Sequence, residues 1–164
     1  MSLMSRLFGY ATKEEAAGSS LEDQHPWVIP PSRDATAILR SLPALFPRDA
    51  FVYFEGTAEA RFAGWLVAHV IPPPLKIAYG TIWPKPDCYH IPLVAALLEE
   101  AAVLVDREGV ALPCLHLHVH DGVQVLLEWH DAFVDDPMYV ASIVPRDRVE
   151  AFARAIGVSP VSQK

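Results

Sequence analysis

The stretch "CLHLHVHDGVQVLLEWHDAF", residues 114–133, decides how the second half of this chain folds. Apolar and polar residues alternate on both sides of Asp121-Gly122, a residue pair that favours a tight turn. Alternation with a period of two is typical of strands that bury one face, so the stretch predicts a β-hairpin. It also contains four of the seven histidines, which makes it the place to look for a chemical site.

The register of this hairpin decides which side chains the histidines meet, because a slip of one residue turns a strand over. A two-residue loop of Asp121-Gly122 would set three histidines against a row of apolar residues. A three-residue loop of 120–122, with Gly122 in a left-handed conformation, instead pairs apolar residues with each other. We favour the second register, because it buries one face without unpaired polar groups. The core residues that it predicts are Leu115, Leu117, Val119, Val123, Val125, Leu127 and Trp129.

The opposite face of the favoured hairpin carries the polar residues. This register places His120 in the turn and the following residues on the second face: Cys114, His116, His118, Gln124, Leu126, Glu128 and His130. Histidines two apart on a strand point the same way at a Cα spacing of about 7 Å, so both rings can reach one ion. One hypothesis is therefore a site for zinc or another transition metal, formed by His116, His118, Glu128 and His130. The competing interpretation is the solvent-facing half of an antiparallel pair, which needs no cofactor.

The segment "EWHDAFVDDP", residues 128–137, is the second candidate site. Glu128, Asp131, Asp135 and Asp136 gather there without a basic residue. The spacing does not fit a calcium loop, so the segment is either a solvated turn or a docking patch for a basic protein partner. Trp83, in "YGTIWPKP", is a further binding candidate, since an aromatic side chain beside prolines lines a pocket or covers the end of a core.

The remaining pattern predicts residues 1–33 as an N-terminal arm and linker, and 34–164 as a single α+β domain. We expect a sheet of about five strands, mixed to antiparallel, with helices packed mainly on one face, because the last three strands follow one another directly. The other two predicted strands are 50–56 and 75–83, and "PKPDCYHIP", 84–92, is predicted as a loop held open by prolines.

Four helices are predicted from apolar residues at helical spacing. The first follows Asp34 as N-cap and should break or kink near Ser41, because Pro43 cannot donate a backbone hydrogen bond. Thr57 is expected to cap the second, which a triple proline ends. The third and fourth are predicted at 92–106 and from Pro145 to Gly157.

Composition narrows the function further. The formal charge of −7 and the pI near 5.4 argue against nucleic acid or an anionic membrane surface as partner. Two cysteines 26 positions apart, with nothing resembling a secretory leader, indicate a cytoplasmic protein. The sequence contains neither a Gly-x-Ser-x-Gly motif nor a glycine-rich phosphate loop.

Two function hypotheses follow. The first is a non-catalytic acidic module that binds a basic protein, in the manner of a bacterial immunity-type or regulatory interaction protein, without a cofactor. The alternative is a metal-dependent enzyme or metal-binding protein that uses the face formed by His116, His118, Glu128 and His130. Neither hypothesis assigns an oligomeric state.

Overall fold

The computed structural model describes residues 20–46, 49–56, 59–72, 87–111, 113–159 and 161–163. In these residues, four α-helices and seven strands form an α+β fold around one open antiparallel sheet. The predicted class is therefore confirmed, and the predicted number of about five strands is corrected to seven. The predicted strand 75–83, Trp83 and the proposed cap Thr57 all lie outside the described residues.

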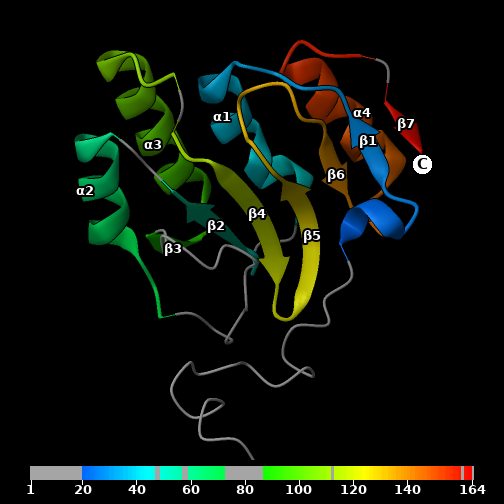
Figure 1. The fold of residues 1–164 in the computed structure, drawn as a ribbon, viewed down its shortest axis with the longest axis horizontal. Helices are drawn as coiled ribbons and strands as arrows, with labels where there is room; N and C mark the ends of the chain where they lie inside the picture. The colour runs from blue at the N-terminus through cyan, green and yellow to red at the C-terminus, as the bar shows by residue number, and fades with distance from the viewer. Residues whose placement is uncertain are drawn as a thin grey trace, which may run out of the picture.

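Every neighbouring pair of strands in the sheet is antiparallel, in the order β3-β2-β4-β5-β6-β1-β7. The β4–β5 hairpin lies at the middle of this sheet, between β2 and β6 (Figure 1). The strands are β1 (Trp27–Ile29), β2 (Phe51–Glu55), β3 (Cys88–Pro92), β4 (His116–Asp121), β5 (Gln124–Trp129), β6 (Met138–Val140) and β7 (Ser162–Gln163).

The helices are α1 (Ala35–Leu45), α2 (Ala60–His69), α3 (Ala95–Glu108) and α4 (Arg146–Ala155), and a short 3-10 helix η2 covers Leu21–Asp23. Asp34 is the N-cap of α1, as predicted, and its Oδ1 accepts a hydrogen bond from the backbone N–H of Ala37 at 2.9 Å. The predicted break at Pro43 is wrong. The proline lies in the last turn of α1, where the buried Leu42 and Leu45 hold the helix against the core.

Three local predictions are corrected, the first two by long-range pairing. Residues 88–92, predicted as part of a loop, form β3, because each of them pairs with a residue of β2. Pro92 ends that strand instead of beginning a helix, which is a position where a strand tolerates proline. In α2 the cap is Glu59, whose Oε2 accepts a hydrogen bond from Phe62 N–H at 2.6 Å.

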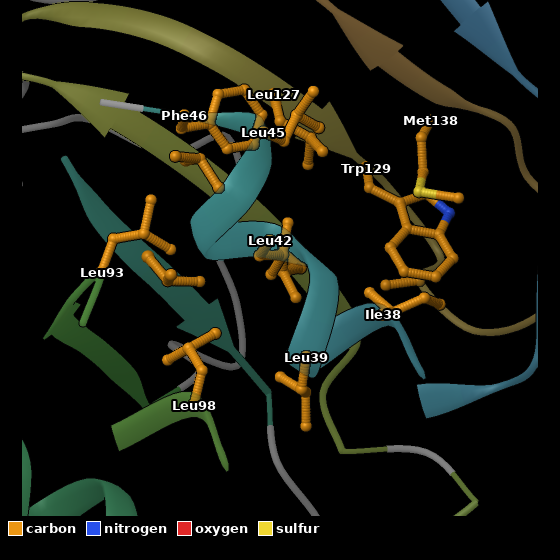
Figure 2. Packing of buried hydrophobic residues seen from close by; sticks show 14 of the residues in the cluster. Ile38, Leu39, Leu42, Leu45, Phe46, Leu93, Leu98, Leu127, Trp129 and Met138 are labelled. Carbon is orange, nitrogen blue, oxygen red and sulfur yellow. The ribbon is translucent and has the colours of Figure 1, made fainter. Parts of the chain in front are cut away.

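One hydrophobic cluster joins the helices to alternate residues of the central strands. Val52 and Phe54 of β2, Leu117 and Val119 of β4, and Leu127 and Trp129 of β5 all belong to it. Figure 2 shows α1 crossing this cluster, with Ile38 near Trp129 and Met138, and Leu45 and Phe46 near Leu127. The intervening residues of the same strands point to the other face of the sheet, because side chains alternate along a strand. That second face carries the candidate site.

Candidate functional site

The β4–β5 hairpin has neither of the two registers considered from the sequence. Asp121 pairs with Gln124, so the turn consists of Gly122 and Val123. A β-bulge then follows on β5, where the pairing steps from His120↔Val125 to Val119↔Leu127. Two predicted core residues are exposed as a result: Val123 in the turn is 79% exposed, and Leu115, which precedes β4, is 51% exposed.

Because of the bulge, the residues predicted to bind a metal have other cross-strand neighbours than in the favoured register. Glu128 was expected opposite Cys114, but it lies opposite His118. Cys114 belongs to the hydrophobic cluster instead, and burial raises the pKa of its thiol. His120, predicted in the turn, is a buried residue of β4 whose ring stacks on Phe51 with centres 5.3 Å apart.

We call the second face of strands β2 to β5 the histidine face. Its cross-strand neighbours form three rows, and the end of β5 adds His130. The rows are Cys88, Glu55 and His116; then His90, Tyr53, His118 and Glu128; then Pro92, Phe51, His120 and Val125.

The histidine face is polar, yet its central residues are buried. His118 is 5% exposed and His120 only 1%, and Glu55, His90 and Tyr53 are also buried. The expectation of a solvent-facing strand surface is therefore wrong for these residues. Alternation identifies residues that share a face, but it does not reveal whether that face is covered.

Burial keeps the central histidines uncharged. Loss of hydration, together with a smaller contribution from the nearby His130, lowers the pKa of His118 to about 3. Loss of hydration likewise lowers the pKa of His120 to about 4 and lowers that of His90. These three imidazoles are thus neutral at pH 7 and act as hydrogen-bonding or ligand groups, not as cations.

Glu128 forms hydrogen bonds through both of its carboxylate oxygens. Its Oε2 accepts hydrogen bonds from Ser20 Oγ at 2.8 Å and from Leu21 N–H at 2.6 Å. Its Oε1 lies 2.9 Å from His130 Nε2. Burial alone would raise the pKa of Glu128, but the hydrogen bonds from His130, Leu21 and Ser20 lower it to about 2, and the same pairing raises the pKa of His130. Glu128 therefore stays ionised and joins the segment before β1 to the centre of the sheet.

The four residues of the metal hypothesis form one cluster. The ring of His130 lies 5.3 Å from that of His116 and 5.2 Å from that of His118, measured between centres, and both pairs are edge-to-face. His116 Nδ1 accepts a long hydrogen bond, 3.4 Å, from Asp131 N–H. As the side chains stand, no group of three or more histidine, cysteine or acidic residues could hold a metal ion within the described residues.

A second polar group lies on the same face and was not singled out from the sequence. The Tyr53 hydroxyl donates a hydrogen bond to Glu55 Oε2 at 2.6 Å and lies 2.9 Å from Cys88 Sγ. Burial and these two neighbours raise the pKa of Tyr53, so its hydroxyl keeps its proton. The signal was present in "FVYFEG", where Tyr53 and Glu55 alternate with apolar residues. Only the pairing of β2 with β4 places them beside His116 and His118.

The β5–β6 loop, residues 130–137, contains the other candidate residues. Asp131 and Phe133 have positive φ angles of 42° and 67°, a conformation that side chains larger than glycine rarely adopt. Two hydrogen bonds hold this backbone, from Ala132 N–H to the Leu115 carbonyl at 2.7 Å and from Trp129 Nε1 to the Asp136 carbonyl at 2.9 Å. These bonds anchor the loop to the segment before β4 and to the end of β5.

Only three of the four acidic residues predicted as a docking patch are exposed on this loop. Asp131, Asp135 and Asp136 are exposed on it, but Glu128 points inward to its hydrogen-bond partners. Asp135 pairs with Arg33 at 2.9 Å. Beside that ion pair lies a pocket of about 340 Å³, lined by Arg33, Ala111, Phe133 and Val134.

Comparison of the chain with protein-family models, with curated proteins and with solved structures gives no match. Within the described residues, none of the helices has the length and apolar character needed to cross a membrane. The histidine face and the β5–β6 loop are therefore interpreted from their own chemistry.

Proposed function

We propose that this protein is a non-catalytic protein-binding module, of the bacterial immunity type or another regulatory kind, that acts in the cytoplasm and docks a basic protein on the β5–β6 loop. The observation that carries this proposal is the apolar pocket lined by Arg33, Ala111, Phe133 and Val134, on a loop that also exposes Asp131, Asp135 and Asp136. Cys88 and Cys114 are not disulfide-bonded, which suits a reducing compartment.

The apolar part of this surface would supply most of the binding energy. Val134 is exposed at the pocket, and Leu115, about half exposed, is bonded through its backbone to the neighbouring Ala132. Protein interfaces commonly combine a few buried apolar contacts with a polar rim, and the central contacts carry most of the affinity. A partner that inserts one apolar side chain beside Phe133 would use the pocket in this way.

The acidic rim would select a partner of opposite charge. The Arg33–Asp135 pair is highly exposed, and such pairs are worth only about 0–1 kcal/mol. A lysine or arginine of the partner could therefore replace Arg33 at little cost. The net charge of −7 would also accelerate the approach of a basic protein at low ionic strength.

The experiment places a photo-crosslinking amino acid at Val134, with a second position at Val67 on α2 as control, since Val67 is also exposed. We expect position 134 to capture a basic protein in the native host, with a yield that falls as salt is added. The double variant Asp135→Lys, Asp136→Lys should abolish capture.

The matched control variant is Asp121→Lys. Asp121 is exposed at the end of β4, beside the turn of the β4–β5 hairpin and not on the β5–β6 loop. It changes the charge in the same sense but leaves the β5–β6 loop intact. Equal capture from positions 134 and 67, or capture that the double variant does not weaken, would refute the proposal. Circular dichroism of each variant checks that the fold is retained.

A further inference from the structure

The exposed surface of α2 and α3 supports an inference that is independent of the docking proposal. We propose that this surface is a homodimer interface, in which α3 packs antiparallel against α3 of a second copy of the chain, around a two-fold axis at Val103. Such an axis brings Glu100 of each copy against Arg107 of the other. The contact uses α2 and α3 and does not involve the β5–β6 loop.

Two ion pairs fix how α2 and α3 lie against each other (Figure 1). Arg61 at the start of α2 pairs with Glu108 at the end of α3. At the other end of α2, His69 Nε2 lies 3.7 Å from Glu100 Oε2. The two helices are therefore antiparallel neighbours, and their outward side chains belong to one surface.

The described residues leave apolar side chains exposed on this surface. Four of the large exposed apolar residues lie on α2, on α3 or at a cap of one of them: Val67, Val70, Val94 and Val103. Val67 is 60% exposed and Val103 is 46% exposed. Exposed apolar residues that gather on one surface are typical of protein–protein contacts, whereas scattered ones need no explanation.

The order of charges along α3 identifies the occupant as a second copy of the chain. Glu100, Val103 and Arg107 are all exposed and follow one another at spacings of three and four residues, so they share one side of the helix. Val103 thus lies about 4.5 Å along the helix axis from Glu100 and about 6 Å from Arg107. A two-fold axis at Val103 reverses this order on the facing helix, so each carboxylate meets a guanidinium. Such a self-complementary surface is what a two-fold dimer requires.

Both charged groups can take up the new contacts. Arg107 Nε donates to Glu108 Oε1 at 2.9 Å, but Glu108 also pairs with Arg61, so two guanidinium groups share one carboxylate. Glu100, whose side chain is 60% exposed, has only the 3.7 Å contact with His69 recorded in the described part of the chain. Exposed pairs of this kind contribute little to stability and exchange easily. One positive and one negative group therefore remain available, on opposite sides of Val103.

The test measures the molar mass of the full chain by sedimentation equilibrium over a range of protein concentrations. We expect a reversible monomer–dimer equilibrium whose dissociation constant rises with added salt, because the paired charges are exposed. Glu100→Lys and Arg107→Glu should each weaken the dimer by at least about 10-fold, since each sets like charges against each other twice. The double variant Glu100→Lys, Arg107→Glu should recover the parent dissociation constant, because the pairing returns with its signs exchanged.

The control is Arg148→Glu, which changes an exposed charge in the same way on α4 and should dimerise like the parent protein. Circular dichroism of each variant checks that the fold is retained. A chain that stays monomeric at every concentration, or a double variant as weak as the single ones, would overturn the proposal. So would a dimer that all of these variants leave unchanged.

A photo-crosslinking amino acid at Val67 gives a second measurement of the same contact. We expect it to yield a covalent homodimer, whose mass distinguishes it from a basic protein captured at Val134. Capture of a different protein at Val67 by a monomeric chain would assign the surface to another partner and refute the homodimer. The homodimer and the docking proposal therefore fail independently of each other.

Discussion

Replacing Glu128 by glutamine tests whether one carboxylate holds the segment before β1 to the sheet. The substitution preserves the shape of the side chain and removes its charge. It weakens three interactions together: those with Ser20 Oγ, Leu21 N–H and His130 Nε2. The glutamine oxygen can still accept from one of these donors, so the variant should fold.

The magnitude follows from the ionisation of Glu128. Its pKa falls from the ordinary 4.5 to about 2 on folding. At about 1.4 kcal/mol for each unit of pKa, the folded state gains about 3 kcal/mol from the ionised form. Because glutamine retains part of the hydrogen bonding, we expect a loss of about 2–3 kcal/mol in the free energy of unfolding.

The pH window of this loss is set by the two partners. The folded pKa of Glu128 is lowered, so its contribution is present above pH 4.5 and is lost as the pH falls toward 2. The folded pKa of His130 is raised, so its share is present below pH 6.5 and is lost as the pH rises through the folded pKa. The difference between parent and variant should therefore be greatest between about pH 4.5 and 6.5.

Urea unfolding at pH 6, followed by tryptophan fluorescence, measures this difference, because the buried Trp129 adjoins Glu128. The control is Glu150→Gln, which removes only an exposed pair with Arg146 on α4, worth about 0.3–0.5 kcal/mol. A loss for Glu128→Gln no larger than that of the control would show that the carboxylate does not hold the two segments together.

Three other predictions concern the fold around the site. Stability should fall as the pH drops from 6.5 toward 4, because His118 and His120 stay neutral in the folded state, with pKa values of about 3 and 4, and gain protons on unfolding; a free energy of urea unfolding that does not decrease between pH 6.5 and 4 would contradict this. Trp129→Ala should cost about 3–5 kcal/mol in urea unfolding, since the ring is fully buried and its Nε1 donates to the Asp136 carbonyl; a loss below 1 kcal/mol would show that the ring is not a central part of the core. Gly56→Ala should destabilise more than Gly122→Ala in the same assay, because both have positive φ but only at Gly56 would the new Cβ lie 2.9 Å from Leu115 Cδ1; Leu115→Ala in the same chain should reduce the excess, since it removes Cδ1 and Cγ.

Local patterns were sufficient for the helices and for the existence of the hairpin. The apolar stripe of α3 predicted a helix at 92–106, and the structure has it at Ala95–Glu108 with Gly109 in the left-handed conformation at its end. The cap at Asp34 and the helix of residues 146–155 were also predicted. These features depend on residues within a few positions of one another, so the sequence contains their cause directly.

Local sequence patterns could not predict which distant segments pair in the sheet. Residues 88–92 resemble a proline-rich loop until their pairing with β2 is known. The hairpin register was wrong because the turn was judged from local apolar pairing alone, whereas β4 must also match β2 on its other side. The bulge on β5 satisfies both requirements, and no turn preference predicts it.

The sequence by itself determined that His116 and His118 point to one face of their strand, and that Glu128 and His130 share a side in the next predicted strand, because side chains alternate along a strand. Only the tertiary structure decided that Glu128 lies opposite His118, that Ser20 and Leu21 bind its carboxylate, and that His118 and His120 are buried. The reason is physical: alternation is a property of each strand, but burial and register depend on what segments far away in the chain place against it.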